Sequence, residues 1–284
     1  MAVTVVTDTT HYLPRELLAG LDVREVSLYV GWDGGLRRES EITDLGAFYD
    51  ELRTAATVPT TSQPSVGDVL EVYEPLLAEG REIVSVHLSA GLSGTLGAAQ
   101  AARAATSAPE RIEVVDSETG CGGLGLAVLA AARAAAAGVS REDVAEAARR
   151  AREDLRMWFC VDTLEYLRRG GRVGAAQSWI GGALKIKPIL ALEREITPIE
   201  RVRTASRAFE RMTEYMEALK EAGRDGWAIQ HIRAQEQADR LADHGRALFG
   251  TEPLFISEVG PVIGAHVGPG LLGVGGVARD LVRA

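Results

Sequence analysis

The sequence predicts an α/β protein with two domains: an N-terminal, Rossmann-like domain with a parallel sheet over residues 1–157, and a C-terminal α/β domain with a mixed sheet over residues 158–284. Three observations support this prediction. Short β-branched, apolar segments alternate with helical segments in the first half. Polar loops follow the expected strand ends, where parallel sheets bind ligands. After about residue 158 the alternation becomes irregular, and 284 residues are enough for two modest domains.

In the first half, expected strands and helices follow one another closely. The expected strands cover residues 2–7, 23–30, 83–88 and 112–115, and the main expected helices cover residues 66–77, 96–105, 122–137 and 141–155. Thr43 and Ser65 are typical helix N-caps, and Asp33-Gly34-Gly35 predicts a tight turn and a hairpin. Three polar loops would then lie together beyond the strand ends, at residues 8–10, 89–95 and 116–119.

The second half mixes strands and helices without a regular period. We expect strands at 158–161, 186–192, 227–232, 254–257 and 271–277, and helices at 174–184, 204–222 and 235–248. The stretch 259–278 is almost uncharged, and His266 is its only ionisable residue. Its seven glycines and two prolines argue against a membrane-spanning helix, so we expect a chain that turns often and lies close to another part of the protein.

Composition disfavours several functional classes. The net charge is −9 and the pI is about 5.2, whereas a general nucleic-acid binder is normally basic. The two cysteines, Cys121 and Cys160, and the five histidines show no metal-ligand spacing, so we expect neither a metal site nor a disulfide. No targeting segment is visible at the N-terminus, and we expect a reducing, cytoplasmic location without a cofactor.

The loop at residues 89–95 is a candidate anion site. It lies between an expected strand and an expected helix, and its small residues would let backbone N–H groups point at an anion, with Ser93 as N-cap. An ordinary capped turn explains the same residues equally well. A serine hydrolase elbow would need glycine where this chain has Thr95, so that reading is disfavoured.

The segment from Arg168 to Arg211 is locally basic. It holds ten basic and four acidic residues in a chain that is acidic as a whole. Arg168-Arg169-Gly170-Gly171-Arg172 resembles a phosphate grip, although no P-loop motif is present. The segment is either solvated helix surface or a patch that meets phosphate, an acidic partner or anionic lipid.

His266 lies among glycines and would be free to face a ligand, although a lone histidine is more often structural. His87 lies in an apolar strand and is expected to be a structural core residue. No element carries a paired acid/base motif. An independent acyl transferase or hydrolase with Ser93 as nucleophile and His266 as base would lack a recognisable third residue to orient the imidazole. The residues alone therefore support an enzyme poorly.

Seven segments in a fixed order carry a family resemblance. They are Val-Thr-Asp-Thr-Thr at 6–10, Pro-Thr-Thr-Ser-Gln-Pro-Ser at 59–65, Ser-Ala-Gly-Leu-Ser-Gly-Thr at 89–95, Val-Val-Asp-Ser at 114–117, Leu-Glu-Tyr-Leu-Arg-Arg-Gly-Gly-Arg-Val at 164–173, Ile-Lys-Pro-Ile-Leu at 186–190 and Gly-Pro-Val-Ile-Gly-Ala-His-Val-Gly-Pro-Gly at 260–270. Nearly end to end, the chain resembles the DegV family, the fatty-acid-binding subunits of bacterial fatty acid kinases.

The resemblance implies a non-catalytic protein that binds a long-chain fatty acid between and within its domains. Its ligand carboxylate would be held by Thr61, Ser93 and His266. It would present this carboxylate to a separate ATP-dependent kinase and carry the acyl-phosphate toward phospholipid synthesis. Further expected roles are head-group, phosphate or kinase contact at Gly94, Thr95, Arg169 and Arg172, and a partner or anionic-membrane patch at Arg201 and Arg203. Candidate acyl-tunnel walls are Trp179, Ile180, Leu184 and Ile189, and ordinary core packing explains each of these four at least equally well.

Physical chemistry agrees with this expectation. A carboxylate that leaves water needs several hydrogen-bond donors, and two hydroxyls with an imidazole supply them. A tail of about fourteen methylenes contributes roughly 11 kcal/mol gross at about 0.8 kcal/mol each, before association costs. A carrier of another lipid carboxylate, with the same head-group site and a differently shaped tunnel, remains an alternative.

Overall fold

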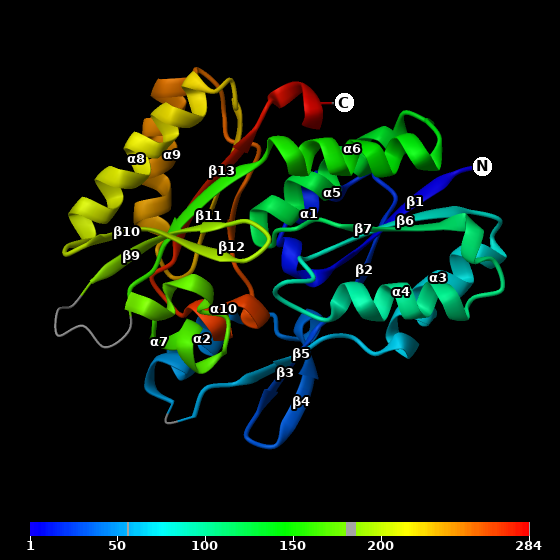
Figure 1. Ribbon diagram of the computed structural model, residues 1–284, viewed down its shortest axis with the longest axis horizontal. Coiled ribbons are helices and arrows are strands. Elements are labelled where there is room, and N and C mark those ends of the chain that lie inside the picture. Colours follow the sequence, from blue (N-terminus) through cyan, green and yellow to red (C-terminus); the bar gives the residue numbers. More distant parts are fainter. Residues whose placement is uncertain (56, 180–185, 284) are drawn as a thin grey trace.

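The computed structural model describes residues 1–55, 57–179 and 186–283, and it contains two α/β halves built on two separate sheets (Figure 1). In the first sheet four parallel strands lie in the order β2-β1-β6-β7. These strands are β1 (Val3–Asp8), β2 (Val23–Val26), β6 (Glu82–His87) and β7 (Ile112–Asp116). The predicted parallel sheet is therefore confirmed.

Helices cover both faces of the first sheet, as the alternation predicted. One face carries α3 (Val66–Ala78) and α4 (Thr95–Ala105), and the other carries α5 (Cys121–Ala136) and α6 (Arg141–Asp154). Ser65 caps α3 in a capping box with Asp68, as expected. Successive side chains of β1 point to opposite faces of the sheet: Val5 packs toward α5, and Val6 packs toward α3.

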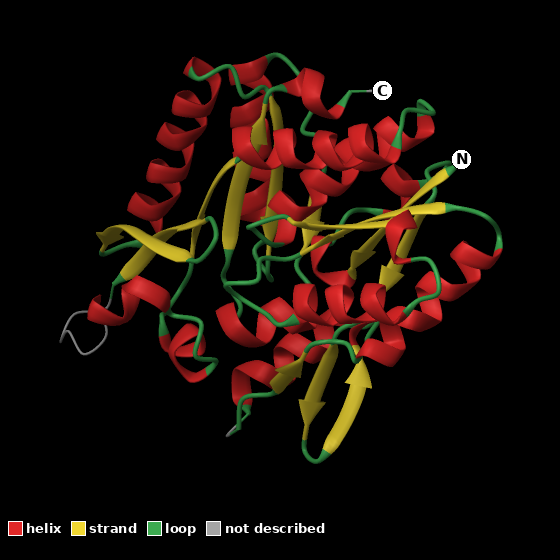
Figure 2. Ribbon diagram, turned by 45° about the vertical axis from the view of Figure 1, so that its right-hand side comes forward, coloured by secondary structure: helices red, strands yellow, loops and turns green. Residues whose placement is uncertain are grey.

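The second sheet is mixed and six-stranded, in the order β10-β9-β8-β13-β11-β12. Its strands are β8 (Arg156–Cys160), β9 (Lys187–Leu192), β10 (Ile196–Val202), β11 (Gly226–His231), β12 (Ile256–Glu258) and β13 (Leu272–Val277). One face packs against α8 (Ala205–Glu221) and α9 (Gln235–Phe249), and the other faces α5, which therefore lies between the two sheets (Figures 1 and 2). The mixed sheet is confirmed, and the domain boundary at 157/158 stays a prediction.

A third, small sheet lies at the lower edge of the molecule in Figure 1, in the order β4-β3-β5. It consists of β3 (Tyr29–Trp32), β4 (Gly35–Arg38) and β5 (Thr60–Ser62). Asp33 and Gly34 both have positive φ and form the hairpin turn between β3 and β4. The prediction of one continuous strand at 23–30 is wrong, because Val23–Val26 belongs to the parallel sheet and Tyr29 begins the hairpin.

Short helices complete the described part of the chain. They are α1 (Arg15–Leu18), α2 (Leu45–Thr54), α7 (Glu165–Arg169), α10 (Pro261–Val267) and the 3-10 turns η1 (Thr9–His11), η2 (Glu39–Glu41), η3 (Pro109–Arg111), η4 (Gly174–Trp179) and η5 (Arg279–Val282). Asp44, and not Thr43, caps α2 through its side chain. None of the helices within the described ranges is long and apolar enough to cross a membrane.

Two expectations for the second half need correction. The apolar helix expected at 174–184 is a 3-10 turn as far as Trp179, and residues 180–184 lie outside the described residues. The stretch 259–278 was expected to turn often, yet most of it is regular: α10 is followed by one glycine-rich turn and then by the buried strand β13. Glycine is tolerated in β13 because five of its six residues pair with both neighbouring strands.

Candidate functional site

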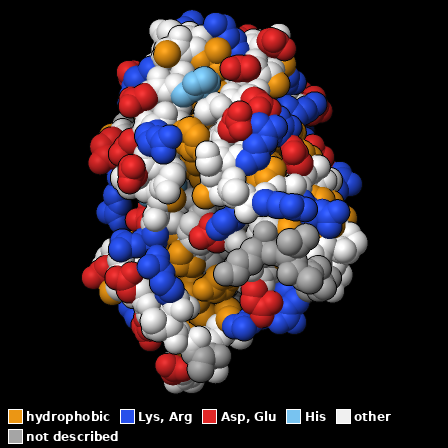
Figure 3. Space-filling model, turned by 90° about the vertical axis from the view of Figure 1, so that its left-hand side faces the viewer, with side chains coloured by type: hydrophobic (Ala, Val, Ile, Leu, Met, Phe, Trp, Pro, Cys, Tyr) orange, Lys and Arg blue, Asp and Glu red, His pale blue; other side chains and the backbone are white. Residues whose placement is uncertain are grey.

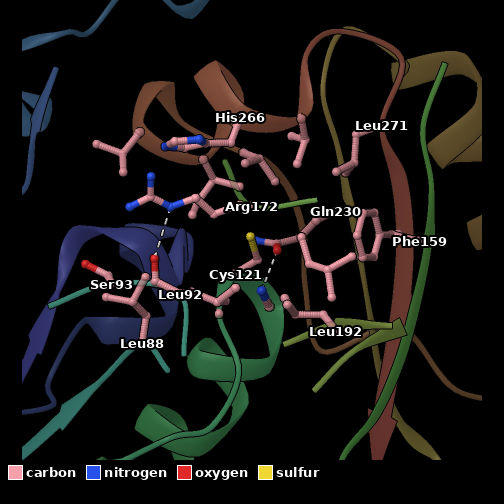
Figure 4. A pocket seen from close by; sticks show the side chains of 18 of the residues that line it. Leu88, Leu92, Ser93, Cys121, Phe159, Arg172, Leu192, Gln230, His266 and Leu271 are labelled. Atoms are coloured by element: carbon pink, nitrogen blue, oxygen red, sulfur yellow. Dashed lines mark hydrogen bonds between the residues drawn. The ribbon is translucent and has the colours of Figure 1, made fainter. Parts of the chain in front are cut away.

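A cavity of about 340 Å³ lies between the two sheets, beneath α10 and the N-terminal end of α5. This volume falls in the range of small-molecule sites. Most of the lining is apolar and comes from segments far apart in the sequence, including Leu88, Leu126, Phe159, Leu192 and Leu271 (Figure 4). Most polar side chains gather at one end, where Ser93, Arg172 and His266 lie opposite Phe159, and Gln230 is the polar exception on the Phe159 side. The arrangement suits an elongated apolar ligand with one polar head.

The three residues expected to hold a carboxylate all line this cavity. Thr61 comes from β5, Ser93 from the loop before α4, and His266 from the last turn of α10. Thr61 Oγ1 lies 2.7 Å from His266 Nε2. Ser93 Oγ lies 2.9 Å from Thr95 Oγ1 and accepts the Thr95 backbone N–H at 3.3 Å. Gly94 is the N-cap of α4, so the expected N-cap role of Ser93 is wrong.

Gly94 and Thr95, which were expected near the head group, take different positions. Gly94 is exposed and lines the cavity, and a side chain there would overlap the amide of Gln63. Gln63 therefore joins the polar end, a contribution that the sequence did not reveal. Thr95 is fully buried and does not line the cavity, and its hydroxyl contacts the Ser93 hydroxyl.

His266 is held as a neutral imidazole. Burial and the nearby Arg172 charge lower the pKa of His266 to about 4. Its Nδ1 is buried and has no hydrogen-bond partner in the described part of the chain. A Cβ added at Gly170 would overlap that Nδ1 atom, so glycine is required there. With no acceptor for a proton on Nδ1, the proton belongs on Nε2, which then donates to Thr61 Oγ1.

A buried carboxylate fixes the beginning of α10 and thereby the position of His266. Glu39, on η2, accepts the Val262 backbone N–H at 2.8 Å and the Tyr12 hydroxyl at 2.8 Å. It also accepts the Thr9 hydroxyl. Burial raises the pKa of Glu39 despite these donors. Sequence reasoning missed Glu39, because the charged residues around it gave no sign that it would be buried.

A tyrosine gives α10 a second anchor. The Tyr49 hydroxyl donates to the Val259 carbonyl at 2.6 Å, immediately before the helix. A Cβ at Gly264 would overlap the same hydroxyl, which explains one glycine of this segment. The Tyr49 side chain is fully buried.

Of the three arginines between 168 and 172, one lines the cavity. Arg172 is exposed at the polar end, where Nη1 donates to the Gly170 carbonyl at 2.8 Å and Nε to the Leu92 carbonyl at 3.3 Å. Arg168 and Arg169 instead bind Glu165 at 2.7 and 2.6 Å and lower the pKa of that carboxyl to about 2. The expected grip of three guanidiniums is therefore wrong.

Two of the four expected tunnel residues, Trp179 and Ile189, do not line the cavity. Ile189 is buried on the opposite face of the second sheet, among residues of α8 and α9. Trp179 lies outside the cavity lining, with the Arg201 guanidinium 5.3 Å from its ring centre. Ile180 and Leu184 lie outside the described residues. The walls are formed instead by residues such as Met157 and Phe159 on β8, which alternation along that strand would have placed on one face.

The basic segment does not form one continuous positive patch. Lys187 pairs with Asp162, Arg194 with Glu118, and Arg211 with Glu200. Figure 3 shows acidic side chains among the basic ones on this face. Arg201 and Arg203 are exposed, and neither has an ion pair within the described residues. The described residues contain no cluster of potential metal ligands.

Comparison with known proteins places the chain in a family. A family model described as an uncharacterised protein of the DegV family matches residues 2–279. A DegV domain-containing protein of Streptomyces coelicolor is 42% identical over 277 residues, covering 96% of this chain and 97% of that protein. A solved DegV family protein from Thermus thermophilus, described by its fatty acid binding, has a TM-score of 0.87 at 35% identity and covers 98% of this chain and 99% of its own. Bacillus subtilis DegV, described as a fatty acid binding protein, has a TM-score of 0.87 at 34% identity, with the same coverage of 98% and 99%. The chain therefore belongs to the DegV family.

Proposed function

We propose that this protein binds a long-chain fatty acid in the cavity, with the carboxylate held directly by the hydroxyls of Thr61 and Ser93 and by His266 through the Thr61 hydroxyl. The observation that carries the proposal is the contact between Thr61 and neutral His266 at the polar end of a mostly apolar cavity. The solved relatives from Thermus thermophilus and Bacillus subtilis, which are described as binding fatty acids, support the same ligand.

The hydrogen-bond donors that are free at the polar end favour an anionic head group. If His266 Nε2–H donates to Thr61 Oγ1, the Thr61 hydroxyl hydrogen is free to donate to a ligand oxygen. The Ser93 hydroxyl has the same freedom if Thr95 donates to it. Arg172 places a positive charge at the same end, and its guanidinium forms no ion pair within the described part of the chain. These donors offset the cost of removing a carboxylate from water.

We also propose that the protein presents this carboxylate to a separate ATP-dependent fatty acid kinase and carries the acyl-phosphate product toward phospholipid synthesis. The polar end supports presentation, since Gly94 and Arg172 are exposed there and leave the head group within reach of a partner. Phosphorylation adds negative charge, which the Arg172 guanidinium favours. The exposed Arg201 and Arg203 are the proposed contact with the kinase and, transiently, with anionic membrane.

Native mass spectrometry of the purified protein, followed by analysis of its organic-solvent extract, tests the ligand. We expect a mass excess that resolves to a fatty acid. A protein that stays at its bare sequence mass after incubation with common fatty acids would overturn the proposal. For the kinase step, charge reversal at Arg201 and Arg203 should slow phosphorylation of bound lipid while lipid occupancy stays unchanged; a loss of occupancy instead would refute the docking role.

A self-sufficient hydrolase or transferase built on Ser93 and His266 finds less support. A histidine with a pKa near 4 is a weak general base at neutral pH, and its Nδ1 meets Gly170 instead of an orienting carboxylate. The Ser93 hydroxyl interacts with Thr95. Turnover of activated acyl esters by the purified protein alone, lost in Ser93→Ala, would revive this alternative.

A further inference from the structure

Three neighbouring strands of the second sheet form a trough on the cavity side. Antiparallel pairing places Phe159, Gly273 and Gln230 in one cross-strand row, and Met157, Gly275 and Ala228 in the next. All six residues line the cavity. In both rows the middle position, on β13, is a glycine, so the centre of the trough has no side chains.

The trough runs away from the polar end and is closed at its far end. Figure 4 places Phe159 and Gln230 across the cavity from Ser93 and Arg172. The next inward position on β13 after Gly275 is Val277, which pairs with Gly226, is fully buried and does not line the cavity. Cys121, Gly122 and Leu126 of α5 form the opposite wall. Gln230 fixes this wall, because its side chain accepts the Gly122 backbone N–H.

We propose that Gly273 and Gly275 set the length of the acyl chain that this protein accepts, an inference that rests on the proposed function. A side chain on either glycine would project into the space between β13 and α5, because inward positions of a strand share one face. The ideal Cβ of Gly273 would lie 3.3 Å from Phe159 Cβ, and that of Gly275 would lie 3.2 Å from Met157 Cβ. Any larger group must therefore extend into the open trough or displace these side chains.

Substitutions at Gly273 and Gly275 should shorten the accepted acyl chain by different amounts. Two residues of strand span about 6.7 Å, roughly the length of five methylenes. Gly275 lies nearer the closed end, so Gly275→Val should exclude only the last part of a long tail. Gly273→Val, one row nearer the head group, should exclude about five more methylenes. Each methylene that can no longer be buried lowers affinity about fourfold.

The test is a set of dissociation constants for saturated fatty acids from decanoic to octadecanoic acid, measured for wild type and variants. We expect the optimum to shift to shorter chains in Gly275→Val and further in Gly273→Val, with affinity for hexadecanoic relative to dodecanoic acid falling on the order of 100-fold. Gly35→Val is the matched control, because Gly35 is an exposed strand glycine outside the cavity, and it should keep the wild-type optimum.

Two further variants decide the question if valine at the glycines prevents folding. Ala228→Leu fills the same row as Gly275 from the neighbouring strand and should also shorten the optimum. Val277→Ala should open the closed end of the trough and shift the preferred acyl-chain length to longer acids. Variants that bind fatty acids with the wild-type length optimum would overturn this inference alone. A wild-type protein that binds no acid of the series would overturn the proposed function and the inference together.

Discussion

Thr61 Oγ1 and His266 Nε2 lie 2.7 Å apart although the two residues are 205 positions apart in the chain. The contact joins the small sheet of the N-terminal half to the helix α10 of the C-terminal half. It also determines which groups at the polar end can donate a hydrogen bond, because His266 is neutral and its other ring nitrogen has no partner in the described ranges. In the proposed complex, the Thr61 hydroxyl is the group that links the imidazole to the ligand carboxylate.

Removing this hydroxyl should weaken acid binding. Thr61→Val keeps the shape of the side chain but leaves His266 Nε2 unpaired and removes a donor to the carboxylate. We expect a loss of about 1.5–3 kcal/mol in fatty acid binding, the range for a hydrogen bond to a charged group. Titration with a fatty acid and with the alcohol of equal length checks this, and the alcohol should lose less.

Thr60→Val is the control for this experiment. Thr60 is the exposed neighbour on β5, and its hydroxyl lies 3.4 Å from the Gly31 carbonyl, away from the cavity lining. It should bind both ligands as wild type does. Equal losses for acid and alcohol in Thr61→Val would show that the hydroxyl supports the fold of the site and not the carboxylate.

The ligand-free protein should lose stability as the pH falls from about 6.5 to about 4. The unfolded chain takes up a proton on His266 near the ordinary histidine pKa of 6.5, whereas burial in the folded protein resists protonation down to about 4. The unfolded state therefore binds more protons in this window, and the free energy of unfolding falls with decreasing pH. The contribution of His266 is at most about 3 kcal/mol.

Urea unfolding at pH 7 and pH 5, for wild type and for His266→Gln, measures that contribution. Carboxylates with lowered pKa values, such as Glu165, act mainly at lower pH and occur in both proteins, so the difference between the two isolates His266. The variant should lose less stability between these pH values than wild type. Identical losses would mean that the folded protein protonates His266 as readily as the unfolded chain does.

The fold was largely predictable because its elements repeat simple patterns. Apolar, β-branched segments followed by polar turns correctly indicated β1, β6 and β7, and Asp33-Gly34 correctly indicated a hairpin turn. What failed was the pairing of residues 23–30, since a continuous run does not reveal that Val23–Val26 and Tyr29–Trp32 join different sheets. Pairing partners far apart in the sequence decide that division.

The residues expected at the ligand head group lie together in the structure, whereas the described residues expected along the walls do not line the cavity. Thr61, Ser93 and His266 lie in motifs of the family, and the structure brings all three to one cavity. Ile189 was misplaced because both faces of β9 are apolar, so its pattern cannot tell the α8 side from the cavity side. Arg169 carried an overlooked signal, for Glu165 four residues earlier predicts the ion pair that the structure contains.

Glu39 should matter for both stability and binding. Glu39→Ala leaves the Val262 N–H and the Tyr12 and Thr9 hydroxyls without their acceptor, and α10 without its anchor. We expect a loss of about 1–3 kcal/mol in the free energy of unfolding, together with weaker fatty acid binding through a displaced His266. Denaturant unfolding and ligand titration measure the two effects.

Glu41→Ala provides the comparison, because Glu41 ends the same 3-10 turn but is exposed. It should change neither quantity beyond about 0.5 kcal/mol, the usual range for a surface substitution. Glu39→Gln keeps an acceptor for the Val262 N–H and should recover part of the loss. If Glu39→Ala lowers stability while acid affinity stays at the wild-type value, then Glu39 does not position His266.

Arg172 should help to keep the pKa of His266 low. The guanidinium contributes to the lowered pKa of the imidazole, so Arg172→Met should raise that pKa toward 6.5, although burial will keep it below. The same change removes a positive charge from the proposed carboxylate site and should weaken acid binding more than alcohol binding. An NMR titration of the His266 ring protons measures the pKa, and the ligand pair measures the affinity.

Arg169→Met is the matched control. Arg169 lies three residues earlier on the chain, but it binds Glu165 at 2.6 Å and does not line the cavity. It should leave both the His266 pKa and the ratio of acid to alcohol affinity unchanged. If the two variants lower acid binding equally, the effect comes from the general positive potential of the segment. A specific loss in Arg172→Met instead identifies one guanidinium, out of three that the sequence offered, as the charge that meets the ligand head group.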